Sequence, residues 1–178
     1  RITDTGAVSQ GRRFEVNVRL DDADQRLRRA QRLLRLRKDA HTILTFKSPP
    51  DGRDNEFKIH RELEVQISDF DAMEQILGSL GFQRRQVYEK WRETFRLGET
   101  VLCLDEMPFG NYLEIEGPKQ AIRQTADRVG LNWDQRILKN YLEMFSILQV
   151  HLQLSFADIK FANFENVTVP GDSHKLFR

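Results

Sequence analysis

The sequence predicts an α+β fold in which long antiparallel strands dominate and a few helices pack outside them. Two observations predict this class. Several stretches alternate apolar and polar residues, which is the pattern of half-buried strands. Three shorter stretches have the helical period of about 3.6 residues. With 178 residues and 39% hydrophobic content, we expect one domain with a sizeable core.

Four candidate strands occupy the first part of the chain. Each places apolar side chains on one face and charged or polar side chains on the other. Arg35 and Arg37 share the polar face of the second strand, and Glu62 and Glu64 share that of the fourth. The four strands are expected at residues 13–20, 33–38, 41–47 and 57–68.

A helix and three more strands follow. Asp69 or the serine before it can cap the helix, and Gly81 is placed to end it. The strands are expected at residues 82–97, 100–106 and 112–116. Lys90 and Arg92 share a face of the first strand. Asp105 shares a face of the second with Val101 and Cys103, and Glu114 and Glu116 share a face of the third with Tyr112.

Two further helices are expected near the end of this region. Pro118 fits the first turn of one helix, and Gly130 is placed to end it. Asn132 or Asp134 can cap the next helix, whose buried stripe includes Tyr141. We expect the main domain to cover residues 1–149, with residues 150–178 as an extension that packs on it or is partly flexible.

Charge is divided unevenly along the chain. The first forty residues hold eleven Lys and Arg against six Asp and Glu, whereas residues 99–118 hold five acids and no Lys or Arg. A flat sheet could turn its charged face into water. Closure of the sheet into a barrel would instead bring both signs inward and form a channel suited to a charged ligand.

Composition excludes several classes of protein. A net charge of +1 argues against a generally basic nucleic-acid binder. The single cysteine, Cys103, rules out an internal disulfide and favours the cytosol. No apolar run is long enough to span a bilayer, and no signal-peptide pattern is present, so we expect a soluble cytoplasmic protein.

An ordered set of short motifs resembles the CYTH superfamily, the triphosphate tunnel metalloenzymes. This family includes class IV adenylate cyclases and hydrolases of thiamine triphosphate and inorganic tripolyphosphate. The resemblance runs from about Arg12 to Phe145. The motifs are Leu34-Arg-Leu-Arg37, Leu44-Thr-Phe-Lys47, Glu62-Leu-Glu64, Glu89-Lys-Trp-Arg92, Leu104-Asp105, Gly110 and Glu114-Ile-Glu-Gly117.

The resemblance implies an antiparallel eight-stranded β-barrel tunnel with helices packed outside. It also implies that Asp105, Glu114 and Glu116 help to hold Mg²⁺ or Mn²⁺, and that Glu62 and Glu64 line the cavity and orient water. The side chains that it assigns to phosphate binding are Arg35, Arg37, Lys47, Lys90 and Arg92. Arg binds phosphate oxygens in a fork, Lys acts as a point charge, and oxygen ligands suit Mg²⁺.

The chain departs from the family pattern in two places. It has no counterpart of the Glu-x-Glu-x-Lys strand that opens the family's domain, nor of the helix after that strand. We therefore expect an N-terminally incomplete tunnel. His60 stands where the family usually has Arg, and Arg61 lies on the opposite face of that strand.

Less specific interpretations of the same residues remain. Arg35 and Arg37 could form a solvated strand face, and Glu114 and Glu116 could protect an edge strand. Glu62 and Glu64 could simply pair with cavity arginines.

The leading function is a metal-dependent phosphohydrolase of inorganic tripolyphosphate or of a nucleoside or thiamine triphosphate. The alternatives are a class IV adenylate cyclase and a non-catalytic module that binds polyphosphate or a nucleotide. The predicted partner is a triphosphate-containing small molecule, with no nucleic acid and no membrane, and a homodimer is left open. RNA binding is disfavoured because the Arg-rich segment 26–38 lacks exposed aromatic residues.

Overall fold

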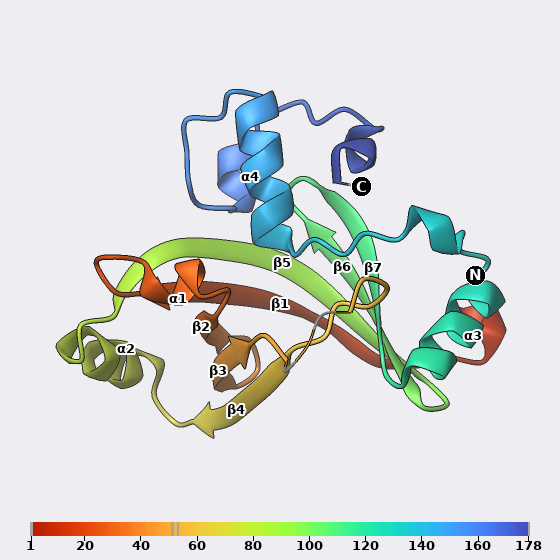
Figure 1. Ribbon diagram of the computed structural model, residues 1–178, viewed down its shortest axis with the longest axis horizontal. Helices are drawn as coiled ribbons and strands as arrows, with labels where there is room; N and C mark the ends of the chain where they lie inside the picture. The colour runs from red at the N-terminus through yellow and green to blue at the C-terminus, as the bar shows by residue number, and fades with distance from the viewer. Residues whose placement is uncertain (1, 51, 53, 178) are drawn as a thin grey trace. The chain divides into compact units, whose positions relative to one another are not determined.

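The computed structural model of the protein describes residues 2–50, 52 and 54–177, and it confirms the α+β class. The described residues form seven strands in one sheet, in the order β4-β3-β2-β1-β5-β6-β7 (Figure 1). The pairs within β1–β4 and within β5–β7 are antiparallel. Among the described residues this sheet has seven strands and is not closed, because β4 and β7 stand at its two ends, whereas the resemblance implies an eight-stranded barrel.

Most elements lie close to their predicted positions. The strands are β1 (Val8–Asp21), β2 (Leu33–Lys38), β3 (Thr42–Ser48), β4 (Arg61–Ile67), β5 (Gln83–Leu97), β6 (Thr100–Met107) and β7 (Gly110–Glu116). The α-helices are α1 (Arg26–Arg29), α2 (Phe70–Ser79), α3 (Lys119–Val129) and α4 (Tyr141–His151). Short 3₁₀ turns are η1 (Thr3–Thr5), η2 (Trp133–Gln135), η3 (Phe161–Phe164) and η4 (Ser173–Phe177).

The first strand, β1, begins at Val8 and not at residue 13, and two further element boundaries differ from the prediction for physical reasons. β4 begins at Arg61, not at residue 57, because its partner strand ends at Ser48, which pairs with Arg61. The next residues, Pro49 and Pro50, have no backbone N–H to continue the ladder. Lys58 and His60 therefore precede the strand.

The last helix also starts later than predicted. A capping box begins α4: the Asn140 side chain accepts from the backbone N–H groups of Leu142 and Glu143, and the Glu143 side chain accepts from the Asn140 N–H. Residues 133–135 form the separate turn η2. Pro118 precedes α3 as its N-cap residue and does not lie in its first turn.

The chain divides into two compact units, and each is described by itself. The second unit comprises residues 14–89 and 157–160. Its core joins one face of β1 and β2 to α2 and includes Val18, Leu20, Leu36 and Leu77. The other face of β1 and β2 is polar, and it pairs Asn17 with Arg37 and Arg19 with Arg35.

The first unit comprises residues 1–13, 90–156 and 161–178. Two-residue turns join its strands: Leu97 pairs with Thr100 across one turn, and Met107 pairs with Gly110 across the other. After β7, Gly117 has a φ of +151°, and a Cβ there would lie 2.9 Å from the backbone oxygen of Glu99. Only glycine fits this close approach without a shift of the backbone.

The first unit has an aromatic core beside β6 and β7. Phe145 of α4 packs against Phe109, Phe156 and Phe164, with ring centroids 6.1–6.5 Å apart. Phe109 lies in the turn between β6 and β7, so this core fixes α4 against that hairpin. In the part of the chain that the structure describes, no helix is both long enough and apolar enough to cross a membrane.

We expect Asn140→Ala to destabilise the protein by about 1 kcal/mol, because it removes the side chain that accepts two backbone N–H groups at the start of α4. Urea unfolding would measure the change in free energy. Asn140→Asp keeps a capping oxygen and should change stability by only a few tenths of a kcal/mol. An equal loss in both variants would contradict the assigned cap.

Candidate functional site

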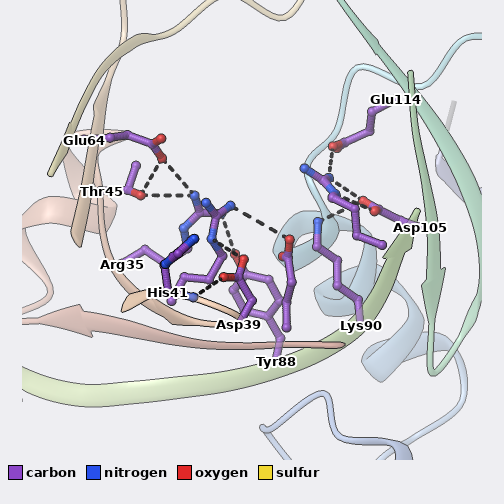
Figure 2. A network of polar contacts seen from close by, with 12 residues as sticks. Arg35, Asp39, His41, Thr45, Glu64, Tyr88, Lys90, Asp105 and Glu114 are labelled. Atoms are coloured by element: carbon purple, nitrogen blue, oxygen red, sulfur yellow. Dashed lines mark hydrogen bonds and ion pairs between the residues drawn. The ribbon is translucent and has the colours of Figure 1, made fainter. Parts of the chain in front are cut away.

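In the second unit, a buried arginine organises the polar face of the strands. Arg35 donates from Nη2 to Thr45 Oγ1 at 3.1 Å and to Glu64 Oε1 at 3.4 Å, and from Nη1 to the Tyr88 hydroxyl at 3.3 Å (Figure 2). The Thr45 hydroxyl donates to the same Glu64 oxygen at 2.7 Å. We call these four residues the Arg35 cluster. It combines β2, β3, β4 and β5 around one cation.

Two further cations lie on the same polar face. Arg37 forms ion pairs with Asp39 at 3.5 Å and Glu15 at 3.9 Å. Lys47 donates to Glu62 at 2.6 Å. The arrangement places the three predicted phosphate-binding residues of this unit beside carboxylates, so an entering anion would compete with those carboxylates for their N–H groups.

Some buried polar atoms on this face have no hydrogen-bond partner among the described residues. Asn17 is 0% exposed, and neither its amide nitrogen nor its carbonyl oxygen has a partner. The Nε atom of Arg35 is also buried and also lacks a hydrogen-bond partner among the described residues. An unsatisfied buried polar group costs about 1–3 kcal/mol. These unpaired groups make the face unfavourable for a purely structural sheet and suited to hydrogen bonds with a ligand.

In the first unit, a buried carboxylate plays the central part. Asp105 is 0% exposed. Its Oδ1 accepts from Arg92 Nε at 2.6 Å, and its Oδ2 accepts from Arg92 Nη2 at 2.6 Å and from Lys90 Nζ at 2.9 Å. The Tyr141 hydroxyl donates to Oδ2 at 2.8 Å. Arg92 also donates to Glu114 at 2.5 Å. We call these five residues the Asp105 cluster, and Figure 2 labels its Lys90, Asp105 and Glu114.

Burial and charge act against each other on the Asp105 cluster. Burial raises the pKa of Asp105, but the hydrogen bonds and charges of Arg92 and Lys90 outweigh burial and leave that pKa below its ordinary value. Burial lowers the pKa of Arg92, but Asp105 and Glu114 raise it further. Burial and the neighbouring carboxylates raise the pKa of Tyr141. Asp105 is therefore ionised at neutral pH, and Tyr141 keeps its proton as a donor.

The predicted metal ligands differ in how many hydrogen bonds their carboxylate oxygens already accept. Glu114 and Glu116 alternate along β7, where they pair with Cys103 and Val101. Glu116 is exposed, Glu114 is half-buried and gives one oxygen to Arg92, and Asp105 already accepts four hydrogen bonds. Within the described ranges, no three His, Cys, Asp or Glu residues are grouped as a ready metal site.

Mg²⁺ commonly binds one or two carboxylates and completes its shell with water and substrate phosphates. The oxygen chemistry of Glu114 and Glu116 fits that mode. Asp105 would have to release at least one present contact to join them.

The sequence-predicted site residues fall into two groups. Arg35, Arg37, Lys47, Glu62 and Glu64 lie in the second unit, and Lys90, Arg92, Asp105, Glu114 and Glu116 lie in the first. The structure pairs each predicted cation with a carboxylate. A solvated strand face is the wrong interpretation for Arg35, which is buried. Each residue's role in binding or catalysis stays a prediction.

Sequence reasoning missed three contributors. Thr45 and Tyr88 carry no charge, whereas the predicted site consisted of charged side chains alone. Tyr141 was placed on the buried stripe of a helix, so packing was the expected role, whereas its hydroxyl bonds Asp105. The Asn140-x-x-Glu143 capping box was the sequence signal that could have shown where α4 starts.

Comparisons with known proteins agree with this fold and its motifs. The CYTH domain model matches residues 1–144. A Methanocaldococcus jannaschii protein named as a putative adenylate cyclase is 26% identical over 141 residues, which cover 78% of this chain and 74% of that protein.

Two solved structures extend the comparison. The PH1012 protein of Pyrococcus horikoshii OT3 is 26% identical with a TM-score of 0.67, covering 79% of this chain and 87% of that one. A Hippeastrum protein, described as a putative adenylyl cyclase with a dominant triphosphatase activity, is 19% identical with a TM-score of 0.54, covering 67% of this chain and 73% of that one. The second similarity concerns the fold alone.

Because the family match covers most of the chain, the protein belongs to the CYTH domain family. The match covers part of each unit and includes every residue of the Arg35 and Asp105 clusters.

We expect Asp105→Asn to lower the free energy of unfolding by about 3–5 kcal/mol, because it leaves the buried Lys90 without its carboxylate partner. Urea denaturation would measure the loss. Asp172→Asn is the matched control, since Asp172 forms an exposed ion pair with Lys175, and exposed ion pairs contribute little to stability. Similar losses in the two variants would contradict the central place of Asp105.

Cys103 should react slowly with thiol reagents in the folded protein. Burial is the main cause that raises its pKa from 9.0 to about 11; Arg92 opposes this shift, and Glu116, Asp105 and Glu114 add to it. The thiolate is the reactive form, so a rise of two units reduces it about a hundredfold below the pKa. Iodoacetamide labelling at pH 8, in buffer and in denaturing urea, would check this. Equal labelling rates would show that the thiol is accessible and unperturbed.

Proposed function

We propose that the chain is a metal-dependent phosphohydrolase of a triphosphate, either inorganic tripolyphosphate or a nucleoside or thiamine triphosphate. The observation that carries the proposal is the state of its five predicted phosphate ligands. Each is at least half-buried and forms an ion pair with a carboxylate. The cations are therefore held in position, and water screens their charge only in part. Membership of the CYTH family supports the triphosphate as the anion.

Phosphate oxygens would replace part of the present ion pairs. Arg92 binds carboxylates through Nε and Nη2, so Nη1 takes none of these contacts and could donate to a phosphate oxygen. Guanidinium groups bind phosphate in two-pronged fashion and lose little ordering free energy when already fixed. The clusters thus supply preorganised positive charge for a polyanion.

In the proposed reaction, water attacks the terminal phosphorus. A new P–O bond forms, the bridging P–O bond breaks, and tripolyphosphate yields orthophosphate and diphosphate. Glu64 offers one oxygen to Thr45 and Arg35 and retains a second that could accept a proton of that water. Glu62, paired with Lys47, is the other candidate to orient it. Cationic side chains stabilise the charge that develops on the phosphate oxygens during such a transfer.

Glu114 and Glu116 would hold the divalent cation, Mg²⁺ or Mn²⁺, with Asp105 as a further ligand if it releases one of its donors. When bound, such an ion would offset the negative charge of the phosphate oxygens. Glu116 suits this role because it is exposed on the same strand face as Glu114.

A class IV adenylate cyclase is the second candidate. It is favoured by the name of the M. jannaschii relative, which is 26% identical over 141 residues. Both reactions need the same cations. They differ in the nucleophile, because the ribose 3′-hydroxyl attacks the α-phosphorus in cyclisation and releases diphosphate. Incubation with ATP and Mg²⁺ or Mn²⁺, followed by separation of cyclic AMP from orthophosphate, distinguishes them.

Binding is tested first by thermal denaturation with tripolyphosphate and Mg²⁺. At a hundred times Kd, the ligand stabilises the folded protein by about 2.7 kcal/mol, which corresponds to a Tm increase of about 5–10 °C. Absence of any shift would contradict both an enzyme and a binding module. A shift without orthophosphate or cyclic AMP would identify the chain as a module that only binds.

We expect Arg92→Gln to reduce kcat/KM for tripolyphosphate about 10- to 100-fold, since hydrogen bonds to charged groups contribute about 1.5–3 kcal/mol. Orthophosphate release measures the effect. Arg84→Gln is the matched control: Arg84 lies on the same strand and binds Glu74 through two nitrogens, but its side chain is exposed. Equal losses in the two variants would contradict a phosphate-binding role for Arg92.

A further inference from the structure

Tyr141 contacts the Asp105 cluster through its hydroxyl. It is the first residue of α4, and the Asn140 capping box fixes where that helix begins. The hydroxyl donates to Asp105 Oδ2 at 2.8 Å, and this oxygen also accepts from Lys90 and Arg92. The helix start therefore places a neutral donor on the same atom that holds two cations.

The ring of Tyr141 makes a second contact with this cluster. Lys90 Nζ lies 5.4 Å from the ring centroid, within the range of a cation–π interaction. On another side, the ring packs against Tyr112 with centroids 5.6 Å apart. One residue of α4 therefore touches both members of the Lys90–Asp105 ion pair, the carboxylate by its hydroxyl and the ammonium by its ring.

Binding of a polyanion would reduce the number of hydrogen bonds that Asp105 accepts. Lys90 and Arg92 would turn some N–H groups toward phosphate oxygens, and Asp105 would then lose hydrogen bonds while staying fully buried. A buried carboxylate that loses its donors is strongly destabilised. The Tyr141 hydroxyl carries no charge, so an anion draws it away less strongly than it draws Lys90. It can keep Asp105 in place in the free and the bound protein.

We propose that Tyr141 is a positioning residue for triphosphate binding, which holds Asp105 so that Asp105 keeps Lys90 and Arg92 directed toward the phosphates. This inference rests on the proposed function, because it assigns a residue that prepares the same site. It extends that site from the strands to the first turn of α4.

Tyr141→Phe tests the proposal because it removes only the hydroxyl and keeps the ring beside Lys90 and Tyr112. Calorimetry with tripolyphosphate in metal-free buffer gives Kd, and orthophosphate release with Mg²⁺ gives KM and kcat. We expect Kd and KM to rise about three- to tenfold, a smaller effect than that of Arg92→Gln because Tyr141 acts on the phosphates only through Asp105. The effect on kcat should be smaller, and Tm should remain well above the assay temperature.

Tyr112→Phe is the matched control. Tyr112 is half-buried and packs against Tyr141, but its hydroxyl makes no hydrogen bond to any residue that the structure describes. Its Kd should equal that of the wild-type protein. A similar loss of affinity in both variants would show that aromatic packing, and not the bond to Asp105, controls binding, and it would overturn the proposal.

A double-mutant cycle separates positioning from a general structural effect. Tyr141→Phe is combined with Lys90→Met and, separately, with Arg37→Gln of the other unit. The factor by which Tyr141→Phe raises Kd should shrink in the Lys90→Met background and persist in the Arg37→Gln background, because only contacting residues are strongly coupled. Equal factors in both backgrounds would overturn the proposal.

The wild-type titration distinguishes this inference from the function beneath it. If the wild-type protein fails to bind tripolyphosphate with or without Mg²⁺, the proposed function is wrong and the inference falls with it. If the wild-type protein binds and Tyr141→Phe binds equally well, only the inference is wrong.

Discussion

The carboxylate of Asp105 has no contact with solvent, and much of the first unit is arranged to satisfy it. A buried charge is tolerated only when it is paired and hydrogen-bonded. Asp105 obtains its donors from Lys90 and Arg92 of β5 and from Tyr141 of α4. Through Arg92, the same interaction reaches Glu114 of β7. One side chain of β6 thus determines how side chains of three other elements must point.

The second unit uses the opposite sign at its centre. Arg35 is buried and donates hydrogen bonds to the hydroxyls of Tyr88 and Thr45 and to a carboxylate oxygen of Glu64. Burial lowers the pKa of Arg35, but Tyr88, Glu15 and Glu64 together raise it further, so the charge is retained. A cation held mainly by neutral hydroxyls and a partly exposed carboxylate keeps capacity for another anion. Under the proposed function, such a local cation would let a chain of net charge +1 bind a polyanion.

Alternation within strands made much of the site predictable. Because side chains alternate between faces, the sequence alone placed Asp105 with Cys103 and Glu114 with Glu116, and the register pairs Cys103 with Glu114. The pattern could not show where strand pairing ends. The start of β4 was therefore predicted too early, at residue 57, although Pro49 and Pro50 end the pairing on the β3 side.

Helical periodicity was a weaker guide than strand alternation. Apolar residues recur across the turn η2 and into α4, which concealed the cap at Asn140 and hence the polar role of Tyr141. Contacts that depend on where a helix begins require the capping chemistry to be recognised, and those that join distant elements require the fold itself.

The turn between β6 and β7 has a consequence for how this chain can change over evolution. Met107 pairs with Gly110, so only two residues separate the strands. An insertion or deletion that moved the register by one residue would turn Glu114 and Glu116 to the other face of the sheet. Substitutions in the turn can be accepted one at a time, whereas a change in its length would remove both carboxylates together. The length of this connection should therefore be more constrained in functional descendants than its composition.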